Sequence, residues 1–206
     1  NREAIYAAFK RKETYATSGP RLRLQMFGGW GFPDNAEQSE DFAVIGYKHG
    51  VPMGGDIIGT DAHTKGSAPS FLLRAVKDPL DANLDRIQMV KGWVEDGKTQ
   101  ERVMDIACSD GQTVDAQTAR CGDNGARVNV ADCTVIPNKG DSELSAVWQD
   151  PDYDPAQKAF YYVRVLENPT CRWSTYDAIA AGVAPRPDMQ STIQDRAWSS
   201  PIWLTK

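Results

Sequence analysis

The run at residues 159–166, Ala-Phe-Tyr-Tyr-Val-Arg-Val-Leu, constrains the fold more than any other stretch of the chain. It is dense in aromatic and β-branched residues, which fit a pleated, half-buried surface. With a period of two, Tyr161, Val163 and Val165 face one way and the residues between them face the other. Because both faces are apolar apart from Arg164, the run predicts a central strand of a packed sheet. We expect Tyr161, Val163 and Val165 to face the core, and we expect Arg164 to have a carboxylate or carbonyl partner.

Short β-type segments recur along the chain and favour a mainly β fold, a β-sandwich of immunoglobulin-like or jelly-roll-like type. The turn Glu-Asp-Gly-Lys at residues 95–98, between apolar runs 84–94 and 99–107, is the strongest hairpin signal. Further strands are expected at residues 21–27, 42–47, 70–76, 128–136, 144–148 and 202–204. Helices are expected at residues 2–12, capped by Asn1, and at 174–181, with one further turn at the capping box 191–194.

Composition and charge narrow the class of protein. A chain of 206 residues with 41% hydrophobic and 25% charged residues is typical of one soluble globular domain. The net charge of −5 comes from interspersed residues with no basic block, which argues against nucleic acid as a partner. No run of apolar residues is long enough to span a membrane, so we expect no membrane insertion. The oligomeric state is left open.

The four cysteines are Cys108, Cys121, Cys133 and Cys171. Their wide, irregular spacing matches no metal finger and favours two disulfides, hence a periplasmic or secreted protein. Among the three pairings we favour Cys108–Cys121 with Cys133–Cys171, because the first would staple a polar loop and the second would join two apolar segments. Four free thiols in a cytosolic protein are the alternative.

No catalytic residues are identified from the sequence. The candidate metal ligands are His49, Asp61 and His63, and an Asp-x-His pair with one further histidine falls short of a usual ligand set. We therefore expect a solvated loop there and no metal. The tryptophans could form a sugar-stacking platform, but Trp93, Trp148 and Trp203 occur in strand patterns, for which we expect core packing.

Several segments of the sequence are specific enough to indicate a resemblance to a known family. They are residues 2–6 (Arg-Glu-Ala-Ile-Tyr), 11–21, 50–56 (Gly-Val-Pro-Met-Gly-Gly-Asp), 82–88, 91–93 (Lys-Gly-Trp), 150–167 and 196–203. Together they closely resemble the C-terminal part of a bacterial family catalogued as domain of unknown function thirty-six hundred and four. The resemblance covers nearly the whole chain.

Longer members of that family resemble metal-dependent barrels of the PHP (polymerase-and-histidinol-phosphatase-like) or amidohydrolase type, and many are similar to exported proteins. By this resemblance, residues 1–20 would be the last helix and strand of an upstream barrel, and residues 21–206 a C-terminal β-sandwich domain. The chain starts in a helix without an initiator Met or a signal peptide, as expected of a fragment or processed product. The divalent metal and its ligands would belong to the parent upstream of Asn1, with no cofactor in this part.

Three functions follow as hypotheses. The favoured one is a non-catalytic accessory β-domain of a metal-dependent hydrolase of unknown substrate, with the upstream barrel of the same chain as its partner. The second is a carbohydrate- or ligand-binding module, which a shallow pocket rimmed by exposed Trp or Tyr would favour. The third is a self-contained metal-dependent hydrolase, which would need a metal bound near His49, Asp61 and His63.

Overall fold

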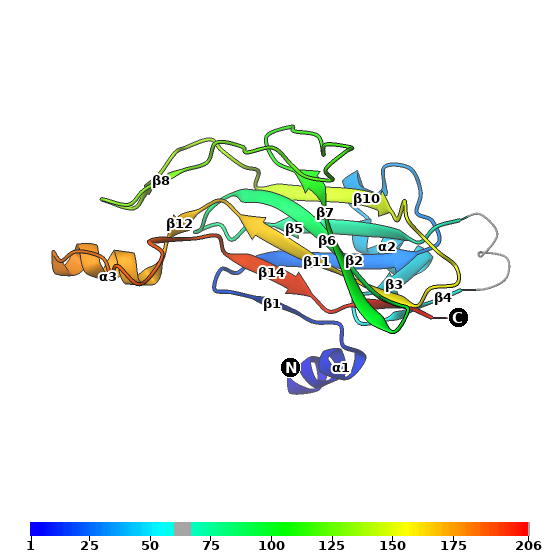
Figure 1. The fold of residues 1–206 in the computed structure, drawn as a ribbon. Coiled ribbons are helices and arrows are strands. Elements are labelled where there is room, and N and C mark those ends of the chain that lie inside the picture. The colour runs from blue at the N-terminus through cyan, green and yellow to red at the C-terminus, as the bar shows by residue number, and fades with distance from the viewer. Residues whose placement is uncertain (60–66, 206) are drawn as a thin grey trace.

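The computed structural model describes residues 1–59 and 67–205, and within them two β-sheets lie face to face (Figure 1). This confirms the mainly β, sandwich-like fold. The first sheet contains β1 (Tyr15–Thr17), β14 (Arg196–Ser199), β11 (Ala159–Glu167), β15 (Ile202–Thr205), β4 (Asp56–Ile58), β6 (Leu84–Glu95) and β7 (Lys98–Cys108). The second sheet runs in the order β10 (Glu143–Gln149), β5 (Ser70–Val76), β2 (Arg23–Gly29) and β3 (Gly50–Pro52).

Strand β11 is the centre of the first sheet. It pairs antiparallel with β6 along its whole length, and with β14 and β15 on its other edge. Tyr161, Val163 and Val165 are fully buried in the core between the sheets, as the alternation predicts. The Arg164 Nε donates a hydrogen bond to the amide carbonyl oxygen of Gln88 at 2.8 Å, so the expected carbonyl partner is present.

The long hairpin of β6 and β7 is confirmed. Asp96 and Gly97 at its tip have φ values of 50° and 75°, the backbone that a two-residue turn of this twist requires. The predicted strands at residues 70–76, 144–148 and 202–204 are also present, within one residue at each end. The turn residues and the alternation of apolar and polar residues therefore predicted most of the strands of the sandwich correctly.

The segment predicted as a strand at residues 42–47 is instead the helix α2 (Phe42–His49). Phe42, Ile45 and Gly46 lie three and four residues apart and face the second sheet, where they pack on a separate core that includes Phe27. A Cβ at Gly46 would lie 2.3 Å from the ring of Phe27, so the helix approaches the sheet closely at this glycine. The prediction was wrong because a short, uniformly apolar run has no decisive period.

Two other predictions were wrong in the long loops. Residues 128–136 form two short strands, β8 (Val128–Asn129) and β9 (Thr134–Val135), separated by a turn in which Cys133 has φ 60°. The supposed capping box at 191–194 contains β13 (Thr192–Ile193), which pairs with β12 (Thr170–Cys171). Helix α3 (Trp173–Ala181) follows β12 and ends at Gly182, as expected.

Helix α1 (Arg2–Arg11) lies outside the sandwich, beneath its edge in Figure 1. Its start is as predicted, because the Asn1 side chain accepts a hydrogen bond from the Ala4 N–H at 2.8 Å. None of its residues is buried. The helix is joined to the sandwich by β1, which pairs antiparallel with β14. A 3-10 turn, η1 (Ala36–Gln38), completes the elements.

Candidate functional site

The face of the first sheet that points away from the core carries a row of aromatic side chains. Side chains alternate along a strand, so the residues of β11 that lie between the buried ones point outward. These are Phe160, Tyr162 and Arg164. The antiparallel register places Trp203 of β15 opposite Phe160, and Trp198 of β14 opposite Arg164. We call these five residues the outer face. The Phe160 ring centroid lies 5.1 Å from that of Trp203 and 6.5 Å from that of Tyr162.

A pocket of about 480 Å³ lies at one end of the outer face, within the size range of small-ligand sites. Its apolar walls are Phe160, Trp203 and Val94, and Trp203 is 43% exposed. Gly92 lies against the Phe160 ring, and a Cβ there would lie 2.3 Å from that ring. Glu101 and Lys158 add polar groups to the lining. The pocket is apolar with a few polar groups, as expected of a binding site for a ring-shaped ligand.

The sequence-based expectation for Trp203 was therefore wrong. Trp93 and Trp148 do pack partly against the main core, but Trp203 projects from the opposite side of the sheet. Only the neighbouring buried residue, Ile202, faces inward. The alternation within β15 could have shown that these two residues point opposite ways, but not which of them faces the core.

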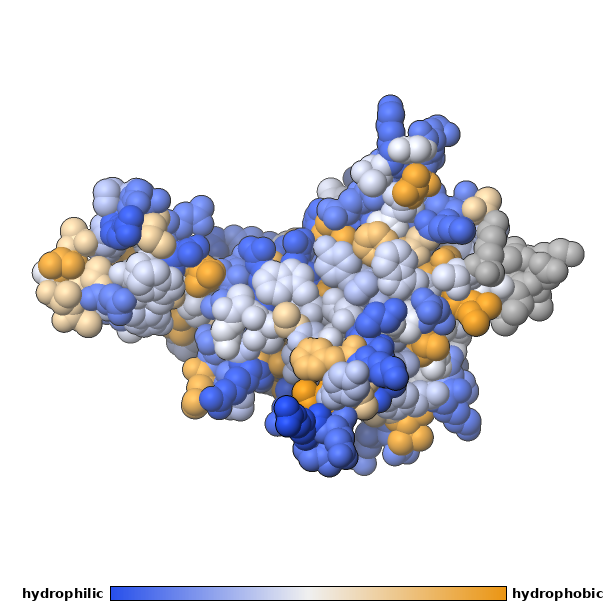
Figure 2. Space-filling model, turned by 90° about the horizontal axis from the view of Figure 1, so that it is seen from below, coloured by the Kyte–Doolittle hydropathy of each residue, from blue (hydrophilic) through white to orange (hydrophobic). Residues whose placement is uncertain are grey.

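The other end of the outer face leads into a second hollow of about 280 Å³, lined by Trp198, Arg196, Arg172, Ser18 and Gln194 among others. In Figure 2 the outline of the molecule is hollowed between the lobe on the left, which carries α3, and a projection at the upper right, and pale residues of weak polarity gather beside the hollow. The outer face thus runs from an aromatic pocket to a hollow that contains arginines.

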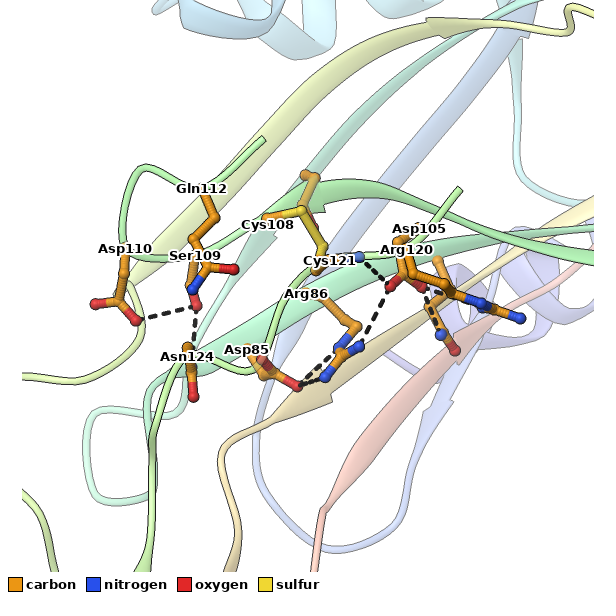
Figure 3. The surroundings of a disulfide bond; sticks show 12 residues. Asp85, Arg86, Asp105, Cys108, Ser109, Asp110, Gln112, Arg120, Cys121 and Asn124 are labelled. Carbon is orange, nitrogen blue, oxygen red and sulfur yellow. Dashed lines mark hydrogen bonds and ion pairs between the residues drawn. A yellow bond between two sulfur atoms is a disulfide. The ribbon is translucent and has the colours of Figure 1, made fainter. Parts of the chain in front are cut away.

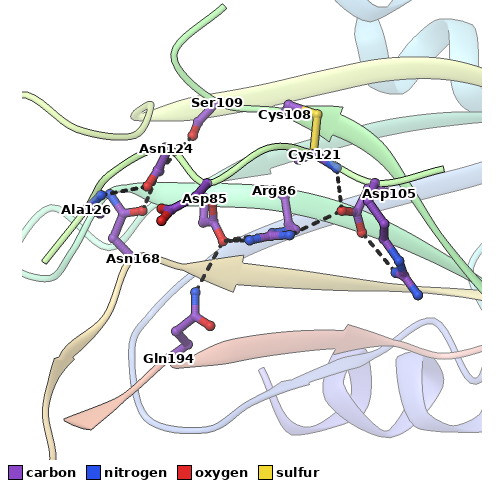
Figure 4. A network of polar contacts seen from close by, with 12 residues as sticks. Asp85, Arg86, Asp105, Cys108, Ser109, Cys121, Asn124, Ala126, Asn168 and Gln194 are labelled. Carbon is purple, nitrogen blue, oxygen red and sulfur yellow. Dashed lines mark hydrogen bonds and ion pairs between the residues drawn. A yellow bond between two sulfur atoms is a disulfide. The ribbon is translucent and has the colours of Figure 1, made fainter. Parts of the chain in front are cut away.

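A buried polar network lies beside the Cys108–Cys121 disulfide (Figures 3 and 4). Arg86 contacts Asp85 at 2.8 Å and Asp105 at 3.2 Å, and Asp105 also accepts from the Cys121 N–H at 2.8 Å. Burial alone would lower the pKa of the Arg86 guanidinium, but the two carboxylates outweigh burial and raise it. The network attaches the loop after β7 to β6, and its members are occupied with one another, so we assign it a structural role.

A second buried network joins the two sheets. The Lys91 Nζ lies 2.6 Å from an Asp150 carboxylate oxygen, which also accepts from the Tyr161 hydroxyl at 2.7 Å. Lys91 donates in addition to the backbone carbonyl of Asp152 at 2.9 Å. Burial, with the charge of Asp150, raises the pKa of the Tyr161 hydroxyl far above its ordinary value. The arrangement fastens the loop after β10 to the core of the first sheet.

Glu167, at the end of β11, is the one fully buried carboxylate of the described chain whose two oxygens have no hydrogen-bond partner there. Burial, together with the charges of Asp81 and Asp195, raises the pKa of this carboxyl group to about 8. Lys77 acts in the opposite direction, but less strongly. Glu167 is therefore protonated in the folded protein at neutral pH.

Comparison with known proteins places the chain in a family. The family model described as "Protein of unknown function (DUF3604)" matches residues 1–206. The chain belongs to this family. No curated protein and no solved structure shows a significant match to it. The resemblance found in the sequence is thus confirmed for the DUF3604 family, whose description assigns no activity.

The predicted site residues of this DUF3604 chain fall in different places. His49 is exposed at the end of α2, and Asp61 and His63 lie outside the described residues, so the expectation of a solvated loop without a metal stays a prediction. Residues 1–59 and 67–205 contain no group of three or more His, Cys, Asp or Glu side chains that could hold a metal ion. The outer face was missed because its residues come from three strands whose pairing the sequence does not reveal.

Both expected disulfides are present, Cys108–Cys121 and Cys133–Cys171. They indicate an oxidising compartment such as the periplasm or the extracellular space. In the described part of the DUF3604 chain, no helix is long and apolar enough to cross a membrane.

Proposed function

We propose that this DUF3604 chain is a non-catalytic accessory β-domain of a metal-dependent hydrolase, and that it docks on an upstream barrel of the same polypeptide through α1. The observation that supports this proposal is the apolar face of α1. Ile5 is 60% exposed, Tyr6 70% and Phe9 66%, although the helix is well capped and regular. These side chains contribute nothing to the core of the sandwich.

A helix of this length is marginal in water without tertiary contacts, so its apolar side chains are expected to pack against something. Burying one such side chain contributes about 1.5–3 kcal/mol. Three of them, adjacent on the helix at positions i, i+1 and i+4, would make a substantial contact. The described residues that follow α1 leave this face open, and a preceding barrel of the same polypeptide would cover it.

Hydrogen exchange of the α1 amides tests the docking. We would compare this chain with a longer one that includes the preceding barrel, and we expect exchange within α1 to slow at least about tenfold in the longer chain. A Phe9→Ser change in the longer chain should restore fast exchange, whereas the amides at the tip of the β6–β7 hairpin serve as the unchanged reference. Equal exchange of α1 in both chains would refute the docking proposal.

The second candidate function is a carbohydrate-binding module, and the pocket beside Trp203 favours it. An exposed tryptophan next to Phe160, over a glycine, offers a flat apolar surface for the face of a sugar ring. Tryptophan fluorescence during titration with neutral oligosaccharides would report binding. Trp203→Ala should abolish the response, while Trp173→Ala, which removes a tryptophan that is 65% exposed on α3, should leave it intact.

A further inference from the structure

We infer that the outer face, together with the hollow beside it, binds an acidic oligosaccharide, whose carboxylate or sulfate groups lie against Arg164, Arg172 and Arg196. This inference rests on the second candidate function and names its ligand class. The aromatic end would stack on sugar rings, and the arginine end would recognise the acidic groups.

The geometry joins the two ends into one surface. Phe160 and Arg164 are four residues apart on β11, which is about 13 Å along a strand. Tyr162 lies between them on the same side, and Trp198 stands opposite Arg164. Trp198 also lines the hollow that contains Arg172 and Arg196, so the row of outward side chains leads from the aromatic pocket to the arginines.

The electrostatics distinguish these arginines from the others. Although the chain has a net charge of −5, none of the three forms an ion pair within residues 1–59 and 67–205, and all three are partly buried. The other arginines of the described chain that make no ion pair are exposed: Arg2, Arg21 and Arg23. Partly buried guanidinium groups without a counter-charge are costly unless an anion binds them.

Arg164 is held in place for such a contact. Its Nε donates to the Gln88 carbonyl oxygen at 2.8 Å, and the Gln88 amide nitrogen donates in turn to the buried Asp105 at 2.7 Å. Its two terminal nitrogens make no hydrogen bond with the described residues. The Arg172 Nε is buried and likewise lacks a partner among them. Guanidinium groups with free planar N–H donors recognise carboxylates and sulfates through paired hydrogen bonds.

The distribution of charge also determines how the ligand is oriented on this surface. Asp195, which precedes Arg196 in the chain, accepts a hydrogen bond from the Ser18 hydroxyl at 2.6 Å, whereas Glu101 and Lys158 line the pocket at the opposite end. An acidic group is therefore attracted to the arginine end, whereas the opposite charges of Glu101 and Lys158 give the aromatic end no comparable attraction. A nucleic acid, with a charge on every nucleotide, would meet repulsion from the net negative charge of the protein as a whole.

Binding measurements with defined probes test this inference. We would titrate the whole chain by calorimetry with a galacturonic-acid hexasaccharide, a heparin-derived sulfated hexasaccharide and neutral maltohexaose. At least one acidic probe should bind about tenfold or more tightly than the neutral one, and its advantage should shrink as salt rises from low to physiological concentration.

Variants separate the two ends of the surface. Arg196→Gln should weaken binding of the acidic probe about tenfold and leave that of maltohexaose unchanged, whereas Trp203→Ala should weaken both. Arg164→Gln should act like Arg196→Gln; if losing its bond to Gln88 disturbs folding, as circular dichroism would reveal, Arg196→Gln carries the test alone. Arg23→Gln, an exposed arginine without an ion pair on the other sheet, is the matched control and should have no effect.

Each contrary outcome has a distinct meaning. Equal affinity for acidic and neutral probes would overturn the inference while the carbohydrate-binding function stands. No binding of any sugar would overturn both. Binding of oligothymidylate more tightly than the acidic sugars would also refute the inference, and would identify the surface as a nucleic-acid site instead.

Discussion

The substitution Glu167→Gln should stabilise the protein at alkaline pH and have little effect at acid pH. The folded state raises the pKa of this carboxyl group from 4.5 to about 8, because the group is buried and faces the carboxylates of Asp81 and Asp195. The folded chain therefore keeps a proton that the unfolded chain releases. Its stability is highest below the unfolded pKa and falls as pH rises towards the folded pKa.

The magnitude follows from the size of the shift. One pKa unit corresponds to about 1.4 kcal/mol, so the penalty that accumulates between about pH 4.5 and pH 8 is on the order of 2–5 kcal/mol. A glutamine at position 167 has nearly the same shape as the protonated carboxyl and cannot ionise. The variant should thus match the wild type at pH 5 and exceed it by a few kcal/mol at pH 8.

Urea unfolding at both pH values, with the disulfides intact, measures this difference. Glu95→Gln is the control, because Glu95 is exposed at the hairpin tip and should give the same difference from the wild type at both pH values. If the stability difference between Glu167→Gln and the wild type does not change from pH 5 to pH 8, the assignment of Glu167 as a buried, protonated carboxyl is wrong.

Three further changes probe the core and the disulfides. Val163→Ala, in a fully buried position, should cost about 2–4 kcal/mol in urea unfolding, and a loss below 0.5 kcal/mol would contradict the central place of β11. Lys91→Met should cost about 3–5 kcal/mol because it leaves the Asp150 carboxylate buried without a counter-charge; a neutral or stabilising effect in the same assay would show that the ion pair is dispensable. Replacing Cys133 and Cys171 together by alanine should cost about 4 kcal/mol, since that disulfide closes a sequence separation of 38 residues; unchanged thermal stability would argue against its formation.

The parts of the fold that local patterns control could be predicted from the sequence. The alternation along β11 assigned Tyr161, Val163 and Val165 to the core, because a strand buried on one side must repeat every second residue. The Asp96–Gly97 turn located the hairpin, since few residue pairs adopt a backbone with two positive φ values. Both signals depend on neighbours in the sequence alone.

The failures occurred where tertiary contacts decide between two local structures. Phe42 and Ile45 suit a strand by propensity, yet the close approach of Gly46 to Phe27 and the apolar surface of the second sheet favour a helix. The Cys133–Cys171 disulfide joins the turn between β8 and β9 to β12, and a turn interrupts what was predicted as one strand. Neither the sheet surface nor the disulfide partner can be known before the fold is.

The candidate site was beyond prediction for a related reason. Trp198, Trp203 and Phe160 share one face only because β14 and β15 both pair with one edge of β11. Each tryptophan, considered in its own strand, is indistinguishable from a core residue. Once the register is known, the same alternation that buries Tyr161 exposes Phe160 and Tyr162. A ligand-binding face on the outside of this sheet therefore adds no new element to the fold, because it uses the alternate positions of strands that the core already requires.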